Sequence, residues 1–224
     1  MSIHNGHRER MKKRFLRYGL SNFDDHNVLE LFLFYAIPRR DVNPIAHSLI
    51  KTFGGLTNVF DASIEELVTI PGMTESAAAL IRLIPHVCRR YLVEQEAVAT
   101  SLNSVEAAGK YIAPYFAYEK EEVVYLLCLD NMRGIICCNE LSRGVVNSAE
   151  ISVRKVMEIV LSRKAASVIL AHNHPNGIAY PSREDSVTTE LISTALRGVG
   201  VELTDHLIFA KDDFVSMKDS GLIR

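Results

Sequence analysis

The spacing of the apolar residues changes near the middle of the chain, and this change limits the folds open to it. Over residues 24–95 apolar side chains recur three and four positions apart, with breaks at proline and glycine, which predicts several short helices. Residues 123–129 are apolar without interruption and end at a turn composition, residues 130–134, which predicts a buried strand. We therefore expect an α+β protein with an all-α N-terminal region followed by an α/β domain.

The boundary between the two parts is expected in the polar connector that precedes the first strand. We predict a helical domain over residues 1–98 and an α/β domain over residues 99–224. In the second domain, residues 135–141 pair with the first strand, a helix runs from near Ser152 to near Lys164, and residues 166–171 form another strand. A further helix begins at Ser182. Its buried side is expected to contain Val187, Leu191, Ala195 and Leu196. Strand, helix and strand in this order predict a mixed sheet.

Composition restricts the class of protein. The 25 basic and 27 acidic side chains give a formal charge of −2, so no overall field attracts nucleic acid. The one basic cluster, residues 8–17, is interpreted mainly as the solvated face of a first helix. No apolar run approaches the roughly 20 residues that span a bilayer, and the first residues lack a secretory h-region. The four cysteines form no C-x-x-C pair. We expect a cytoplasmic globular protein without membrane contact, whose number of subunits no pattern fixes.

The N-terminal part contains a candidate DNA-binding element. Residues 70–74 separate a helix that begins at Asp61 or Ser63 from an alanine-rich helix that begins near residue 75. Two helices joined by a tight glycine turn resemble the helix-hairpin-helix module, whose backbone amides bind a DNA phosphate without reading bases. The usual module has a second glycine where this chain has Thr74. A purely structural αα-hairpin is an equal alternative.

The densest group of reactive side chains follows the strand predicted at residues 166–171. Because side chains alternate along a strand, His172 and His174 emerge on one face, close enough to bind one ion. Asp185 lies in the first turn of the next helix, where the helix dipole favours a carboxylate; as a third ligand it leaves one tetrahedral position open for water. Ser182 and Asp185 also match a capping box, which needs no metal. We favour a metal site, with Zn²⁺ as the ion because nothing in the sequence indicates redox chemistry.

These residues resemble a known motif. His-x-His-Pro at residues 172–175, followed by Ser182 and Asp185, resembles the JAMM signature of JAB1/MPN-domain metallopeptidases. The longer string, with Asp205 and His206 after the next strand, is similar to the RadC-like bacterial branch of that family. RadC-like proteins also have a helical N-terminal region with Phe-Gly-Gly, here residues 53–55, and a helix-hairpin-helix-like element. The resemblance therefore covers nearly the whole chain.

The resemblance implies a JAB1/MPN-type domain that hydrolyses an amide bond with zinc. His172, His174 and Asp185 would hold the metal, and Ser182 would hydrogen-bond the developing oxyanion. In the wider family a glutamate on the first strand acts as general acid and base, and Glu122, directly before residues 123–129, occupies that place. Its competitors, whose default role is surface charge, are Glu119, Glu121, Glu140 and Glu150.

Three function classes remain open. The favoured one is a zinc metallopeptidase or isopeptidase with an unidentified protein or peptide substrate. The second is a DNA-associated protein, as the DNA-repair label of the RadC-like family suggests, which would bind DNA weakly and without sequence preference; near-neutral charge and Thr74 count against it. The third is a zinc-bound scaffold without turnover. Asn173 departs from the Ser or Thr of deubiquitinating relatives. For Asp205 and His206 we prefer a structural pair at a strand start to the orientation of a zinc ligand.

Overall fold

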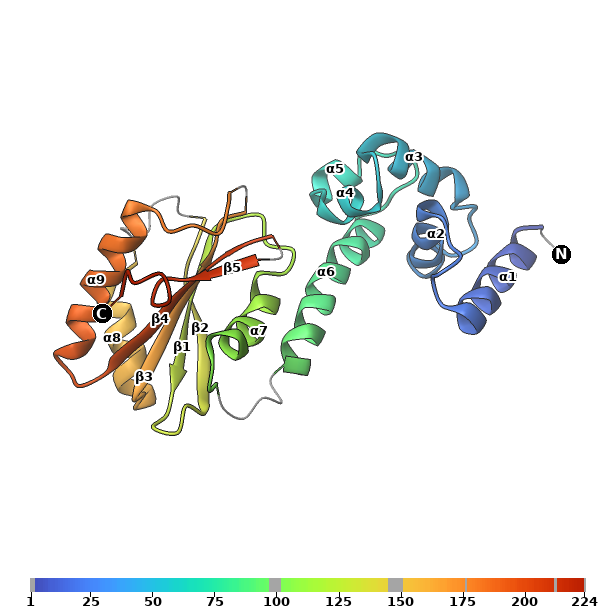
Figure 1. Ribbon diagram of the computed structural model, residues 1–224. Coiled ribbons are helices and arrows are strands. Elements are labelled where there is room, and N and C mark those ends of the chain that lie inside the picture. The colour runs from blue at the N-terminus through green and yellow to red at the C-terminus, as the bar shows by residue number, and fades with distance from the viewer. Residues whose placement is uncertain (1–2, 97–101, 145–150, 176, 212, 224) are drawn as a thin grey trace. The chain divides into compact units, whose positions relative to one another are not determined.

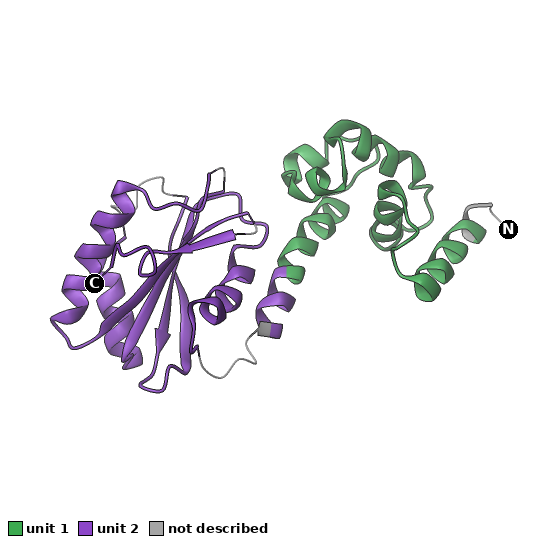
Figure 2. Cartoon of the chain, in the orientation of Figure 1, with its two compact units in different colours: residues 1–88 green, residues 89–224 purple. Residues whose placement is uncertain are grey.

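The chain forms two compact units, Met1–Cys88 and Arg89–Arg224 (Figure 2). The computed structural model describes residues 3–96, 102–144, 151–175, 177–211 and 213–223. The division between the units falls inside a helix, earlier than the boundary that the sequence predicts at residues 98–99. Among the described residues, no helix is both long enough and apolar enough to cross a membrane.

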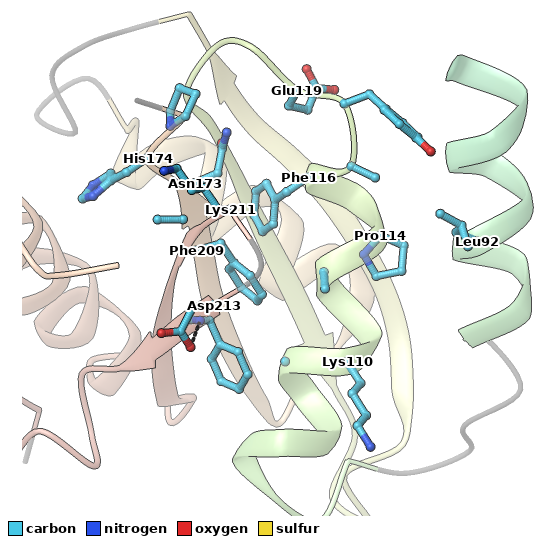
Figure 3. Close-up of a pocket in the computed structure, with 17 residues that line it drawn as sticks. Leu92, Lys110, Pro114, Phe116, Glu119, Asn173, His174, Phe209, Lys211 and Asp213 are labelled. Atoms are coloured by element: carbon cyan, nitrogen blue, oxygen red, sulfur yellow. Dashed lines mark hydrogen bonds between the residues drawn. The ribbon is translucent and has the colours of Figure 1, made fainter. Parts of the chain in front are cut away.

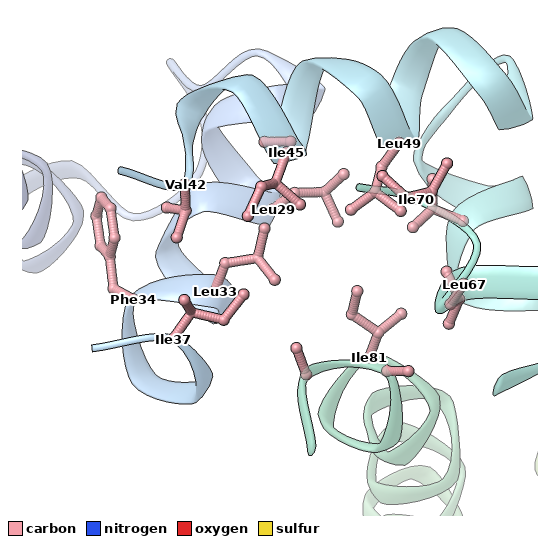
Figure 4. Close-up of a cluster of buried hydrophobic side chains, with 14 of the residues drawn as sticks. Leu29, Leu33, Phe34, Ile37, Val42, Ile45, Leu49, Leu67, Ile70 and Ile81 are labelled. Atoms are coloured by element: carbon pink, nitrogen blue, oxygen red, sulfur yellow. The ribbon is translucent and has the colours of Figure 1, made fainter. Parts of the chain in front are cut away.

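The first unit is all-α, as the helical spacing predicts. Its helices are α1 (Ile3–Tyr18), α2 (Asp25–Ala36), α3 (Asn43–Phe53), α4 (Leu56–Asp61), α5 (Ile64–Leu67) and the start of α6 (Glu75–Glu96) (Figure 1). The core brings together buried side chains of α2, α3 and α6, among them Leu29, Leu49 and Ile81 (Figure 4). Burial of this apolar surface stabilises α2 and α3, which have 12 and 11 residues and would be marginal as isolated helices.

The predicted αα-hairpin forms between α5 and α6. Ser63 begins α5 through a capping box, so Ser63 and not Asp61 is the cap. Gly72 has a φ of 94°, which favours glycine in the turn. Thr74 Oγ1 accepts a hydrogen bond from the backbone amide of Ala77 at 3.2 Å, so this residue caps the start of α6.

The second unit contains a mixed sheet, as predicted. Its elements are α7 (Val105–Phe116), β1 (Val123–Leu129), β2 (Ile135–Arg143), α8 (Val153–Arg163), β3 (Ser167–Asn173), α9 (Arg183–Arg197), β4 (Glu202–Ala210) and β5 (Asp213–Ser216). The strand order is β2-β1-β3-β4-β5. Strands β3 and β4 are parallel, and the other three neighbouring pairs are antiparallel.

Helices cover both faces of this sheet (Figure 1). On one face Leu126 and Leu170 pack with buried side chains of α8 and α9. On the other face Leu127 and Ala171 pack with buried side chains of α7. Because neighbouring residues of a strand point to opposite faces, both faces need apolar residues, which explains the uninterrupted apolar run of β1.

The buried face of α9 differs from the prediction. The sequence predicts Val187 and Leu191 on the buried side, but they are 61% and 57% exposed. The buried side chains are Asp185, Thr188, Thr189, Ile192 and Leu196. The prediction is confirmed for Leu196 and was wrong for Val187 and Leu191, because it sought only apolar residues at helical spacing, whereas the first turns of α9 bury polar side chains.

This buried face of α9 predicts unequal losses of stability for two neighbouring substitutions. Ile192→Ala should lower the free energy of unfolding by about 3 kcal/mol, because it leaves a cavity in the core. Leu191→Ala should lower it by less than about 0.5 kcal/mol, because that side chain is mainly in water. Urea denaturation followed by circular dichroism measures both. Equal losses would mean that Leu191 is also in the core.

Candidate metal centre

Three side chains meet at the carboxyl end of β3. We call His172, His174 and Asp185 the acceptor trio, and one ligand atom from each lies within 4.8 Å of the other two. The Nε2 atoms of the two histidines are 2.9 Å apart. Asp185 Oδ1 lies 3.3 Å from Nε2 of His172, and Asp185 Oδ2 lies 3.7 Å from Nε2 of His174. The predicted spacing therefore brings the three side chains together.

The acceptor trio has one side open to solvent. The side chains of His172 and Asp185 are 2% and 3% exposed, whereas that of His174 is 21% exposed. A small molecule or a protein segment can therefore approach the trio on the His174 side. Burial of the other two groups lowers the local dielectric and strengthens every electrostatic interaction there.

The proton positions test whether the trio suits a cation. His174 Nδ1 lies 3.1 Å from the carbonyl oxygen of Ile178, and a carbonyl only accepts, so Nδ1 donates. Neutral His174 then has a lone pair on Nε2, which faces His172 Nε2 and the Asp185 carboxylate. Converging acceptors repel one another unless a cation or a shared proton lies between them. Two imidazole nitrogens and a carboxylate are a donor set that fits zinc.

Asp185 is both a helix cap and a member of the trio. Its Oδ2 accepts hydrogen bonds from the backbone amide and the hydroxyl of Ser182, at 2.8 and 2.7 Å. Ser182 Oγ in turn accepts from the Asp185 amide at 3.0 Å, which completes a capping box. Asp185 Oδ1 faces His172. Burial opposes ionisation of Asp185, but His172 and Ser182 hold its pKa below the ordinary value. The capping and metal-binding interpretations are therefore compatible, because each uses a different oxygen.

Glu122 borders the acceptor trio. It lies directly before β1 and lines a cavity of about 360 Å³ together with His174. Desolvation raises the pKa of Glu122, and the charges of His172, His174 and Asp185 also act on it. Glu121 lines the same cavity with an exposed side chain. Two of the five candidate glutamates thus line a cavity that reaches the trio, and the side chain of Glu122 is the less exposed of the two.

The other candidate glutamates belong to an ion-pair network or lie outside the described residues. Glu119 pairs with Arg89 and with Arg143. Glu140 pairs with Arg143 at 2.8 Å, and this arginine holds the pKa of Glu140 below its ordinary value. Glu150 lies outside the described residues. Glu119 and Glu140 are therefore fixed as charged partners of arginine.

Asn173 fixes the backbone around Glu122. The Asn173 side chain is buried on the sheet face opposite to His172. Its Oδ1 accepts from the Val123 amide at 2.8 Å, and its Nδ2 donates to the Glu121 carbonyl at 3.0 Å. These two backbone groups flank Glu122. Asn173, which stands where the deubiquitinating relatives have Ser or Thr, therefore holds the backbone on both sides of Glu122. The sequence alone did not reveal this role.

Asp205 and His206 have separate roles on β4. Asp205 accepts from Ser216 Oγ at 2.6 Å, so it joins β4 to the residue at the end of β5. His206 Nε2 lies 2.8 Å from Nδ1 of His172. His206 therefore contacts a member of the acceptor trio, as the alternative of an orienting residue requires. The contact arises because parallel β4 lies beside β3, with His206 in register with the residue at position 170.

An apolar cavity opens beside the acceptor trio (Figure 3). Its volume is about 750 Å³, and its lining includes His174 and aromatic side chains from α7, β4 and β5, namely Phe116, Phe209 and Phe214. Gly109 on α7 allows close packing there, because an added Cβ would overlap the ring of Phe214. An apolar cavity with a few polar groups in its lining is typical of a ligand-binding site.

Comparison with known proteins shows the family of the chain. The model of the RadC-like JAB domain matches residues 102–222. The UPF0758 protein of Fusobacterium nucleatum is 32% identical, with 97% of each chain covered. The UPF0758 protein of Ruegeria pomeroyi is 31% identical, again with 97% of each chain covered, and that of Saccharophagus degradans is 31% identical with 96% covered. By the extent of these matches, the chain belongs to the RadC-like JAB domain family.

Proposed function

We propose that this protein is a zinc-dependent metallopeptidase or isopeptidase of the JAMM type. The observation that supports this most is the convergence of two imidazole Nε2 atoms and a carboxylate within 4.8 Å, beside a cavity that Glu122 lines. His172, His174 and Asp185 would hold the metal. When bound, zinc supplies the Lewis acidity that makes water a nucleophile near neutral pH and polarises an amide carbonyl.

The remaining steps belong to the chain's own side chains. Glu122 takes a proton from the attacking water and returns it to the leaving amine, and the raised pKa of Glu122 suits a group that must both accept and donate. Ser182 would hydrogen-bond the oxygen of the polarised carbonyl by turning to it the hydroxyl proton that Asp185 Oδ2 accepts in this structure. The amide C–N bond breaks, giving a carboxylate and an amine.

We further propose that the substrate is a protein or peptide. The apolar cavity of about 750 Å³ reaches His174 and is large enough for an apolar side chain next to the cleaved bond. Its aromatic wall, which includes Phe116 and Phe209, would pack against that side chain and align the amide with the trio (Figure 3).

Metal analysis tests the site directly. The full chain dialysed against zinc and then against buffer should retain one zinc per chain. His172→Ala and Asp185→Ala should each lose most of this zinc, because each removes one of three donors. His86→Ala, which alters an exposed histidine of α6, is the matched control and should keep it. Undiminished zinc in a His172→Ala, His174→Ala double variant would move the metal to another site.

Substitution of Glu122 distinguishes catalysis from metal binding alone. Glu122→Gln should keep the zinc content but slow peptide hydrolysis by about 100- to 10,000-fold, because an amide cannot accept the proton. Glu140→Gln is the control and should stay near the wild-type rate, since Glu140 is paired with Arg143. A library of peptides and isopeptide-linked proteins, with a chelator control, supplies the substrate. A zinc-loaded wild type that cleaves none of them would instead favour the scaffold without turnover.

DNA binding by the helical unit remains a weaker proposal. Thr74 already accepts from the Ala77 amide, whereas the Arg40 guanidinium lies beside Gly72 in the hairpin turn. We expect weak, sequence-independent binding of duplex DNA that falls steeply as the salt concentration rises, and that weakens further in Arg40→Ala. Fluorescence anisotropy at two salt concentrations measures this, with Arg90→Ala as control. Tight binding that salt does not weaken would favour a DNA-associated function.

A further inference from the structure

A chain of buried hydrogen bonds runs from His172 back to the first turn of α9. His172 Nδ1 is 2.8 Å from His206 Nε2, and His206 Nδ1 is 2.6 Å from Thr189 Oγ1. Thr189 Oγ1 is 2.5 Å from the backbone carbonyl oxygen of Asp185. All four residues are at most 3% exposed. Two members of the acceptor trio are thus connected through Thr189 and His206.

The backbone carbonyl of Asp185 determines which atom donates in its hydrogen bond with Thr189. A carbonyl oxygen only accepts, and two oxygens 2.5 Å apart need a proton between them, so the Thr189 hydroxyl donates to it. Met217 Sδ, at 3.6 Å, is a more distant and weaker acceptor for that proton. With its only proton used, Thr189 Oγ1 must accept from His206. His206 therefore has a proton on Nδ1.

The position of the proton on His206 determines which atom donates in its hydrogen bond with His172. His206 is 1% exposed, and its two ring nitrogens face Thr189 and His172 rather than a carboxylate, so the buried ring is neutral and has one proton only. Because that proton is on Nδ1, His206 Nε2 accepts, and His172 Nδ1 must donate to it. When His172 is neutral, its Nδ1 proton leaves Nε2 with a lone pair directed at His174 and Asp185.

We infer that Thr189 and His206 are positioning residues that fix the tautomer and ring orientation of His172 for metal binding. The role of these residues in metal binding rests on the proposed function, whereas the directions of the hydrogen bonds follow from the contacts alone. Without the hydrogen bonds through His206 and Thr189, the His172 ring is free to place its proton on Nε2, the atom that must bind the metal. Metal-binding histidines generally have such a partner on the second nitrogen. In this protein the partner is a second histidine, oriented by a threonine.

Nitrogen NMR of the metal-free, histidine-labelled chain reads the tautomers without any activity. At about pH 8, above the ordinary histidine pKa, His206 should be protonated on Nδ1 only and His172 should be protonated on Nδ1. Thr189→Val removes the acceptor with little change of shape and should release both preferences, whereas Thr189→Ser should retain them. A wild-type His206 protonated on Nε2, or a Thr189→Val variant with unchanged tautomers, would overturn the inference.

Zinc affinity, measured by competition with a chelating dye, gives the second readout. Thr189→Val should weaken zinc binding by about 10-fold, Thr189→Ser should stay within about twofold, and His206→Gln should lose about 10- to 100-fold. Thr188→Val, at a buried neighbour on α9, is the matched control and should bind as wild type. Equal affinity in Thr189→Val and Thr188→Val would overturn the inference. Wild-type protein with the stated tautomers but no zinc binding would overturn the proposed function and leave the hydrogen-bond directions standing.

Discussion

Three acceptor atoms converge at the carboxyl end of β3, and the polar contacts around them in the second unit depend on this convergence. Burying two imidazole nitrogens and a carboxylate side by side is unfavourable without a cation or protons between them. The surrounding polar groups compensate for part of this cost. Ser182 satisfies one oxygen of Asp185, while the Ile178 carbonyl and His206 each engage the remaining nitrogen of a histidine. Asp185 and Thr189, two of the polar side chains that α9 buries, take part in these contacts.

The same constraint explains why one short segment serves both folding and chemistry. Asp185 completes a capping box that starts α9, and it turns its other oxygen to His172. The start of the helix therefore fixes the carboxylate that the site needs, and no separate element is required to position it. On the opposite face of β3, Asn173 holds the backbone on both sides of Glu122. Consecutive residues of β3 thus organise the acceptor trio and the proposed base.

The proposed chemistry depends on a difference between the candidate carboxylates. Glu119 and Glu140 are bound to arginine, and Asp185 is held ionised beside His172. Glu122 has its pKa raised by desolvation and borders the open side of the trio. A protein can move the pKa values of two neighbouring acids in opposite directions by giving them different environments. One acid then stays charged, and the other can exchange protons. The apolar cavity at His174 adds a surface that can align a protein substrate.

The local sequence determined the helices of the first unit, the first three strands of the second, the start of α9 at Ser182 and the meeting of His172 with His174. These follow from apolar spacing, capping chemistry and the alternation of side chains along a strand, all of which act over a few residues. The buried polar face of α9, the role of Asn173 and the contact of His206 with His172 were decided only by the tertiary structure. Each joins residues from separate elements, and Asn173 is 52 positions from the Glu121 carbonyl that it binds. A buried polar residue has a partner only where the strands and helices place one, so its role depends on packing that spacing along the chain does not specify.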